Sequence, residues 1–367
     1  MSDYSPTWPG LLGDPNLTLV TDPRIDPRLL EAMGTLELEA VELALADTPT
    51  LSSNPSYKEC VEFVAALEAS AEPVYAKKFD SLPPVLGVTR RSEVIQGVDG
   101  NEIPLIIHEP AEGNRPLPGI LRTHGGGMVM QSATDPQYMR LADELAATGM
   151  VVVNVEFRNG AGKLGDHPFP AGLNDCASAT RWTYANKDAL GISHIVVSGE
   201  SGGGNLCIAT ALKAKQEGWI GEIAGVYACC PYLAGPYNAP LPELMSLREN
   251  DYMGQLSMIT SLFKVYDPTG DHARNPLAWP YHATAEDLAG LPPHTISVNE
   301  LDELRDEGLI YARKLMASGV PTISRTVNGT THGADIETMV AIMPDVYGAT
   351  IRDIHGFATS LMPRRLP

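Results

Sequence analysis

The feature that most constrains the fold is a segment in the middle of the chain where an apolar run ends in G-x-S-x-G and opens directly into a helical pattern. The run covers residues 196–198 and the motif covers 199–203. A strand that reverses into a helix within a few residues crowds its own backbone, so Gly199 and Gly203 let the chain pass and leave Ser201 exposed at the tip. The helix N-terminus beside Ser201 favours a developing anion. A glycine-rich turn without chemistry is the alternative, but the strand-then-helix context favours a nucleophile.

From about residue 86 onward, strand-like and helix-like runs alternate. Two runs between residues 92 and 108 are joined by Asp99-Gly100, which is typical of a β-hairpin. The later β-branched runs are short, continuous and separated by helical segments, which indicates parallel strands buried on both faces. The sequence therefore predicts an α/β fold with a mostly parallel central sheet after an antiparallel hairpin. The expected strands are 119–123, 150–157, 194–198, 223–229, 294–298 and 321–327, and the expected helices are 137–147, 172–187, 203–217, 304–318 and 338–360.

Two regions lie outside this alternation. Before the hairpin, apolar residues recur at helical spacing over 27–47 and 57–67. Residues 232–275 carry Met and Leu at helical spacing, with no strand expected before Pro293. An insertion leaving the C-terminal end of a strand lies where open α/β sheets bind ligands, so we interpret it as a lid; a pair of core helices is the alternative. The expected division is an arm with cap helices at 1–85, a core at 86–231 and 276–367, and the lid at 232–275.

Composition narrows the classes of partner. The 367 residues carry a net charge of −19 without a Lys/Arg cluster, which disfavours nucleic acid, and no apolar run is long enough to span a bilayer. The N-terminus lacks the features of a secretory signal, so we expect a cytoplasmic protein. The five cysteines are odd in number and lack C-x-x-C spacing, which argues against a disulfide framework and a zinc site. The sequence does not decide whether the protein is a monomer or a homo-oligomer.

A serine hydroxyl is a weak nucleophile, so Ser201 needs a base, and the base needs an acid to fix its tautomer. On a doubly wound hydrolase sheet these follow in the order Ser, Asp or Glu, His. His332 lies in the loop after the expected strand 321–327 and is the candidate base. Other histidines are out of order or position: His108, His124 and His167 precede Ser201, His272, His282 and His294 precede the acid, and His355 falls within the last expected helix.

The acid is expected after the strand 294–298, where five carboxylates follow one another closely. Asp302 is closest to the strand end while still outside the expected helix, and we take it as the candidate. Glu303, Asp306 and Glu307 are expected to form the charged first turns of that helix, where acids are stabilising. Glu300 completes the set.

An oxyanion needs at least two N–H donors aimed at one point. His124-Gly125-Gly126-Gly127 follows the expected strand 119–123 and matches an H-G-G-G loop, whose glycines bring backbone N–H groups close without side-chain obstruction. We expect Gly126, Gly127 and Gly202 to be the donors.

These motifs resemble the hormone-sensitive-lipase-like branch of the α/β hydrolases. Besides Asp302 and His332, the resemblance is carried by residues 124–128, 167–171, 199–205 and 304–308, and it extends over about 90–360. It implies an α/β-hydrolase fold in which the N-terminal helices and the insertion form a cap. The family commonly has Ala after the serine, Pro after the acid and an aromatic residue two positions after the histidine, whereas this chain has Gly202, Glu303 and Ala334. We expect Gly202 to leave open space beside the serine, so that Gly202→Ala would narrow the tolerance for bulky esters.

The expected activity is hydrolysis of short- to medium-chain or bulky carboxylic esters through an acyl-enzyme, with no metal or organic cofactor. A lactonase acting on a macrocyclic lactone, or an aryl amidase, would use the same residues, because the reactions pass through the same kind of oxyanion. A non-catalytic small-molecule binding protein of the same fold is the third interpretation. Some binding proteins that resemble this family lack the histidine that His332 supplies here, which disfavours this interpretation. The expected partner is a small-molecule ester.

Overall fold

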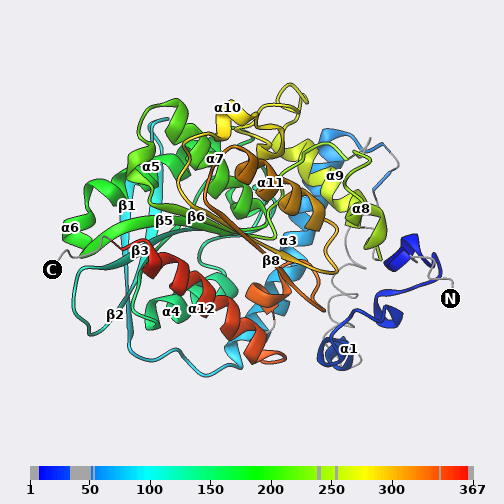
Figure 1. Cartoon of the computed structure of the whole chain (residues 1–367), viewed down its shortest axis with the longest axis horizontal. Coiled ribbons are helices and arrows are strands. Elements are labelled where there is room, and N and C mark those ends of the chain that lie inside the picture. Colours follow the sequence, from blue (N-terminus) through cyan, green and yellow to red (C-terminus); the bar gives the residue numbers. More distant parts are fainter. Residues whose placement is uncertain are drawn as a thin grey trace.

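The computed structural model describes residues 8–33, 51–52, 54–237, 241–252, 255–338 and 340–362. Eight strands form one sheet in the order β1-β2-β4-β3-β5-β6-β7-β8 (Figure 1). Strand β2 is antiparallel to both of its neighbours, and the pairs from β4 to β8 are parallel. The expected mostly parallel sheet with an antiparallel hairpin is therefore confirmed. The strands are β1 (Val88–Gln96), β2 (Glu102–Pro110), β3 (Leu117–Thr123), β4 (Val151–Val155), β5 (Ile192–Glu200), β6 (Gly225–Cys229), β7 (His294–Asn299) and β8 (Thr322–Val327).

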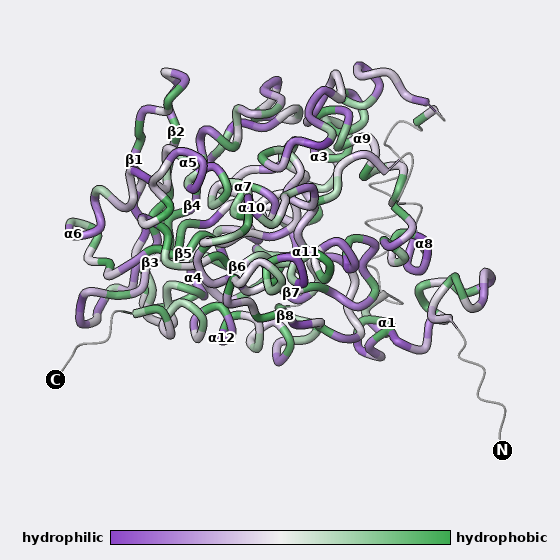
Figure 2. Tube along the Cα trace, turned by 45° about the horizontal axis from the view of Figure 1, so that its top comes forward, coloured by the Kyte–Doolittle hydropathy of each residue, from purple (hydrophilic) through white to green (hydrophobic). Residues whose placement is uncertain are grey.

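Helices cover both faces of the sheet (Figure 1). Alternate residues of the central strands point to opposite faces, so that Val197 packs on the side of α5, α7 and α11 while Val196 packs on the side of α4 and α12. Figure 2 shows the hydrophobic residues, in green, concentrated around the central strands β3, β4 and β5. The core helices are α4 (Pro136–Ala147), α5 (Ala171–Ala185), α6 (Lys187–Leu190), α7 (Gly202–Gln216), α10 (Ala285–Leu288), α11 (Arg305–Ala317) and α12 (Pro344–Ser360), and the short turns are η1 (Gly10–Leu12), η2 (Leu19–Thr21), η3 (Gly162–Leu164), η4 (Ile220–Glu222), η5 (Pro280–His282) and η6 (Ala334–Thr338).

Several expected boundaries differ from the structure, among them those of β4, of the last helix and of the second expected helix. β4 ends at Val155, and the carboxylate of the next residue, Glu156, accepts hydrogen bonds from Ser132 Oγ and the Ala133 N–H. The last helix begins at Pro344 rather than 338, since the π-helical turn η6 precedes it. α3 (Tyr57–Asp80) starts with the Ser56 capping box where a helix was expected, but continues well past residue 67. α1 (Pro27–Met33) confirms the start of the first expected helix, and residues 34–50 lie outside the described residues.

The insertion forms helices above the glycine loop that follows β3. It contains α8 (Ser246–Glu249) and α9 (Gln255–Tyr266), and the described residues between Pro231 and Pro293 form no strand. α9 packs against α3, and Lys264 Nζ donates a hydrogen bond of 2.6 Å to Pro55 O before α3. A Cβ placed on Gly127 would lie 2.7 Å from Leu262 Cδ1. The N-terminal helix and the insertion therefore meet beside this loop.

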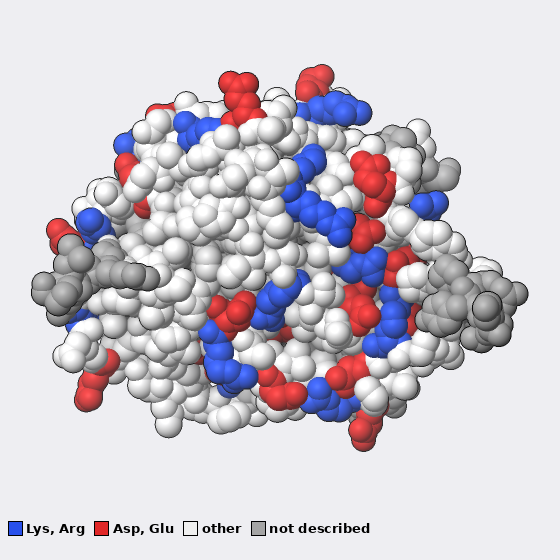
Figure 3. Space-filling model, in the orientation of Figure 1, with Lys and Arg blue, Asp and Glu red and all other residues white. Residues whose placement is uncertain are grey.

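The surface charges are mixed. On the face shown in Figure 3, Lys and Arg side chains alternate with Asp and Glu side chains around a broad uncharged area. Among the helices that the structure describes, none combines the length and the apolar character needed to cross a membrane.

Candidate active site

Four neighbouring strands deliver four chemically active side chains to one edge of the sheet. Ser201 follows β5, Cys230 follows β6, Asp302 follows β7 and His332 follows β8. These strands are adjacent and parallel, so their carboxyl ends share an edge, which is where open α/β sheets place ligands.

Ser201 lies at a strained turn between β5 and α7. Its φ is 54° and its ψ is −119°, outside the backbone regions that residues other than glycine commonly adopt. The turn has no room for side chains on either flank, because a Cβ on Gly203 would lie 2.1 Å from Thr123 O and a Cβ on Gly199 would lie 2.3 Å from Gly203 O. The Ser201 N–H donates to Cys229 O at 3.0 Å, which fixes the turn to the neighbouring strand. The geometry is that of the nucleophile elbow expected from the sequence.

A continuous series of hydrogen bonds joins Ser201, His332 and Asp302. His332 Nε2 lies 2.9 Å from Ser201 Oγ, and His332 Nδ1 lies 2.9 Å from Asp302 Oδ2. Because an ionised carboxylate only accepts hydrogen bonds, Nδ1 carries the donated proton and Nε2 is left as the acceptor for the serine hydroxyl. Asp302 is fully buried, and its Oδ1 accepts the Leu304 N–H at 2.9 Å. Of the five carboxylates after β7, Asp302 is the one that the structure brings to His332.

The remaining carboxylates have other surroundings. Glu300 Oε2 accepts the Gly329 N–H, and Asp306 Oδ2 accepts the Ser246 N–H. Burial raises the pKa of Glu307 to about 8, and this carboxyl accepts hydrogen bonds from the Leu233 N–H and the Tyr237 hydroxyl.

The expectation for Glu303 is wrong. α11 begins at Arg305, so Glu303 precedes the helix, and it is a buried residue instead of a solvated charge in the first turn. Burial and the neighbouring charge of Asp302 raise the pKa of Glu303 to about 8. Asp306 and Glu307 do lie in the first turn of α11, but Glu307 is buried as well.

The glycine loop after β3 lies directly against the elbow. Gly126 and Gly127 have φ values of 84° and 62°, which only glycine adopts readily. Within the described residues, the N–H groups of Gly126, Gly127 and Gly202 donate no hydrogen bond. A Cβ on Gly202 would lie 2.5 Å from Met128 N and 2.6 Å from Gly127 Cα, so the expectation of open space at Gly202 is wrong: the loop backbone fills it.

A buried ion pair lies next to the glycine loop, and the sequence did not predict it. Arg122 at the end of β3 pairs with Glu200 at the end of β5, and both side chains are almost fully buried. Glu200 Oε1 also accepts the Gly125 N–H at 3.1 Å. The sequence does carry one indication of the ion pair, because Arg122 and Glu200 are opposite charges at the ends of two otherwise apolar strands.

The first residue of the glycine loop, His124, is buried. It is stacked on Phe157 with ring centroids 4.0 Å apart, and burial lowers the pKa of His124 to about 3, so its ring is neutral.

The loop that carries His332 rests on a second buried network. Asn299, at the end of β7, donates to Asp335 Oδ1 at 2.8 Å and to Thr330 Oγ1 at 2.7 Å. Its Oδ1 accepts the Gly333 N–H at 3.3 Å, directly after His332. Thr350 on α12 donates to the other oxygen of Asp335 at 2.6 Å. Residues on both sides of His332 are therefore tied to the end of β7.

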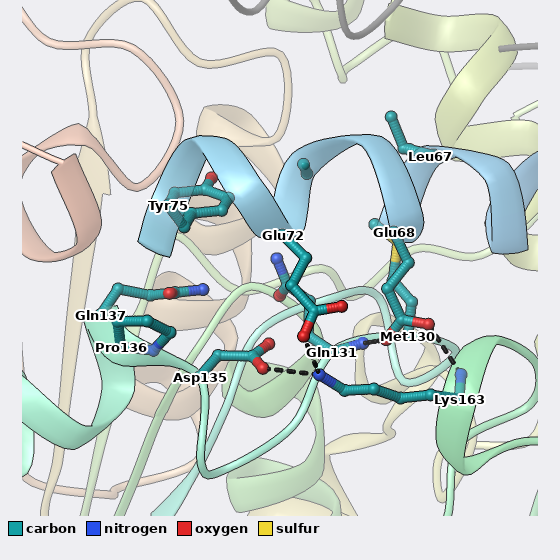
Figure 4. A pocket seen from close by; sticks show the side chains of 11 residues that line it. Leu67, Glu68, Glu72, Tyr75, Met130, Gln131, Asp135, Pro136, Gln137 and Lys163 are labelled. Atoms are coloured by element: carbon teal, nitrogen blue, oxygen red, sulfur yellow. Dashed lines mark hydrogen bonds and ion pairs between the residues drawn. The ribbon is translucent and has the colours of Figure 1, made fainter. Parts of the chain in front are cut away.

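A separate small cavity of about 30 Å³ lies under α3 (Figure 4). Figure 4 shows Lys163 held by Asp135 and Glu72 at its edge. Gln137 is buried, and within the described chain its amide atoms have no hydrogen-bond partner. Such a space suits one or two water molecules. Ser201, Asp302 and His332 do not line it, so this cavity is distinct from the candidate active site.

The chain belongs to the α/β-hydrolase family, because the family model described as alpha/beta hydrolase fold matches residues 120–336. Among solved structures, brefeldin A esterase, described as a bacterial homologue of human hormone sensitive lipase, matches with a TM-score of 0.89 and 41% identity over 97% of this chain and 99% of its own. The esterase Est22 matches with a TM-score of 0.78 and 34% identity over 94% and 99% of the two chains.

Two curated relatives are also esterases by name. The carboxylesterase NlhH of Mycobacterium tuberculosis is 30% identical over 71% of this chain and 80% of its own length. An arylesterase of Saccharolobus solfataricus is 30% identical over 67% of this chain and 77% of its own length. The expected hormone-sensitive-lipase-like fold is confirmed, as is the particular resemblance to brefeldin A esterase that the sequence carries at 156–159, Gly202 and 332–335.

Proposed function

We propose that this protein is a serine carboxylesterase that hydrolyses small carboxylic esters through an acyl-enzyme. The observation that carries the proposal is the series of hydrogen bonds from Ser201 through His332 to Asp302, with 2.9 Å at each step. The relatives named carboxylesterase, arylesterase and esterase support the same reaction class.

In the acylation step His332 acts as general base. Its Nε2 lone pair faces Ser201 Oγ and accepts the serine proton as Oγ attacks the ester carbonyl carbon. The Asp302 carboxylate, which has no exposure to solvent, stabilises the imidazolium that forms. His332 then gives the proton to the leaving alcohol, and the acyl group stays on Ser201. In deacylation His332 deprotonates a water molecule, which attacks the acyl-enzyme and releases the acid.

The N–H groups of Gly126, Gly127 and Gly202 stabilise the oxyanion in both steps. The glycine loop lies directly against the elbow, which supports donors from the two segments acting together beside Ser201. Fixed donors of this kind need no reorganisation as charge develops, and losing one typically costs about 100-fold to 1,000-fold in kcat.

The cap is part of the same proposal. α3 and the insertion helix α9 pack together over the glycine loop, which supports a cap formed by residues 1–85 and 232–275 over a core at 86–231 and 276–367. Such a cap would contact the acyl or alcohol group and set the preference among short, medium and bulky esters. A cytoplasmic location also belongs to the proposal and is supported by five cysteines that are all buried and free of disulfides.

An active-site label tests the mechanism. An alkyl phosphonate ester with a p-nitrophenyl leaving group should add to Ser201, as located by peptide mass spectrometry, and should abolish turnover of p-nitrophenyl esters. Ser201→Ala should lose both the label and the turnover, and His332→Ala should lose turnover. Turnover that survives in Ser201→Ala would refute the proposal, and binding of esters without any turnover would favour a binding protein. A panel of linear esters and macrocyclic lactones then separates esterase from lactonase.

A further inference from the structure

Cys230 is the one side chain among the four at this sheet edge that the proposed reaction does not use. It follows β6, between the strands that lead to Ser201 and to Asp302. The ligand atoms of Cys230, Asp302 and His332 all lie within 4.8 Å of one another. In the part of the chain that the structure describes, no other group of three or more His, Cys, Asp or Glu side chains meets this condition.

We propose that Cys230, Asp302 and His332 form an inhibitory site for a thiophilic divalent cation such as Zn²⁺ or Cd²⁺. Binding of the cation does not depend on the reaction that the protein catalyses, but its inhibitory effect rests on the proposed esterase function.

The three donors match this class of ion. A thiolate, an imidazole nitrogen and a carboxylate oxygen are the ligands that Zn²⁺ takes in tetrahedral sites, and the soft thiolate disfavours Mg²⁺ and Ca²⁺. Bond lengths of about 2.0 to 2.3 Å bring the ligand atoms of such a site to roughly 3.3 to 3.6 Å from one another. Separations near the 4.8 Å limit therefore have to shorten, while His332 Nδ1 and Asp302 Oδ2, now 2.9 Å apart, have to move slightly apart. With the thiol deprotonated, the two anionic ligands balance the charge of the cation in a buried place.

The cation would occupy the place of the hydrogen bond between His332 and Asp302. In the free enzyme the imidazole carries one proton, on Nδ1, and accepts the serine hydroxyl through Nε2. When Nδ1 binds the cation, that proton moves to Nε2, and the Cys230 thiol releases its own proton to solvent. Nε2–H then faces Ser201 Oγ and cannot accept the serine proton, so acylation stops.

The surroundings hold Cys230 in place and restrict entry. The Cys230 N–H donates to Ser297 O at 2.7 Å, which pins the residue between β6 and β7. Its exposure is 1% and that of Asp302 is 0%, whereas the side chain of His332 is 26% exposed. A cation therefore has to enter past His332, which predicts inhibition that develops slowly after mixing. The sequence argument against a zinc site rested on cysteine spacing, which has no bearing on ligands from three separate loops.

Binding is tested by adding Cd²⁺ to the full chain after treatment with a chelator. Wild type and the inactive Ser201→Ala variant should both develop the ultraviolet charge-transfer band of a Cd–thiolate bond at one equivalent. Cys230→Ser should lack that band, while Cys229→Ser, which changes the neighbouring buried cysteine, should keep it. His332→Ala should weaken Cd²⁺ binding at least tenfold and serves as the second variant if Cys230→Ser does not fold. Absence of the band in wild type would overturn the proposal.

Inhibition is tested with Zn²⁺ and a p-nitrophenyl ester, each variant being compared with its own rate without metal. Zn²⁺ should inhibit wild type and Cys229→Ser with slow onset, reversibly on addition of EDTA, and Mg²⁺ at the same concentration should not. Cys230→Ser should need at least ten times more Zn²⁺ for half-inhibition; equal sensitivity would overturn the inhibitory site. A Cd–thiolate band in a wild-type protein without ester turnover would instead refute the proposed function and leave the metal site standing.

Discussion

The two halves of the candidate active site are held in different ways. The nucleophile half, Ser201 and the glycine loop, is fixed by backbone in direct contact with backbone, because every Cβ added at Gly199, Gly202 or Gly203 would lie within 2.6 Å of a main-chain atom. The acid–base half, Asp302 and His332, is fixed by side-chain hydrogen bonds that reach to Asn299 and beyond.

The difference predicts how each half responds to substitution. Backbone contact leaves no room for an added atom, so the nucleophile half should fail abruptly. A hydrogen-bonded network loses one bond at a time, at about 0.5 to 1.5 kcal/mol for a typical bond and more where a buried group is left unpaired, so the acid–base half should weaken in steps.

The largest effect is expected for Gly203→Ala. The new methyl would lie 2.1 Å from Thr123 O and 2.4 Å from His124 O, so the elbow or the start of the glycine loop has to move. We expect a loss of about 3 kcal/mol or more in unfolding free energy, and kcat at least about 100-fold lower in any protein that folds. Urea unfolding and ester turnover measure both. The matched control is Gly356→Ala in α12, where an added Cβ meets nothing within 4 Å; a similar cost at the two positions would contradict the steric argument.

A loss of stability without a comparable direct effect on the nucleophile is expected at the buried ion pair. Glu200→Gln keeps an acceptor for the Gly125 N–H but leaves the Arg122 guanidinium without its counter-charge, at a cost of about 3 to 5 kcal/mol. Arg122→Met should cost less, because burial already raises the pKa of Glu200 and the carboxyl can take up a proton, which arginine cannot lose. Chemical unfolding of the two variants at neutral pH measures the order; the reverse order would mean that Glu200 is neutral in the native pair.

A graded effect is expected at Asn299. Asn299→Ala removes the bonds to Asp335, Thr330 and the Gly333 N–H, so the loop carrying His332 loses the side-chain hydrogen bonds that tie it to the end of β7. We expect kcat to fall about tenfold with little change in KM, since substrate binding is untouched while the base is misplaced. Thr350→Val is the control: it also removes a bond to Asp335 but lies one step farther from His332. Equal losses of kcat in both variants would indicate general destabilisation in place of a positioning role.

The contrast between the nucleophile half and the acid–base half also explains which parts of the site the sequence could predict. The nucleophile half consists of contiguous motifs, so local spacing and the strand-then-helix context predict the elbow at Ser201 and the loop at Gly126 and Gly127. His332 is predicted because its place after β8 follows from strand order, and Asp302 because it stands close to the end of β7 and outside the following helix.

The supporting groups could not be predicted, because their partners lie far apart in the chain. Asn299 and Thr350 both reach Asp335 only when β7 and α12 are packed, and Arg122 meets Glu200 only through the pairing of β3 with β5. Gly202 was misjudged for a related reason: whether its missing Cβ leaves space depends on how closely the glycine loop approaches, which no local pattern specifies.

No loss of stability is expected for Glu303→Gln, which tests whether the acid–base half tolerates a second full charge beside Asp302. Burial, with the charge of Asp302 adding to it, raises the pKa of Glu303 from 4.5 to about 8, so between these pH values the folded state holds a proton that the unfolded state has released. Stability is therefore lost as pH rises through this window, by at most about 1.4 kcal/mol per pH unit.

Glutamine stays neutral, so the variant avoids this loss. Glu303→Gln should match wild type at pH 5 within about 1 kcal/mol and exceed it at pH 8, where its Tm should be a few degrees higher. The exposed Glu112→Gln serves as control and should show no such divergence. Scanning calorimetry at both pH values measures the difference. A gap in Tm that stays constant from pH 5 to pH 8 would mean that Glu303 is already ionised in the folded protein, and that the side-chain network around Asp302 holds two adjacent carboxylates without penalty.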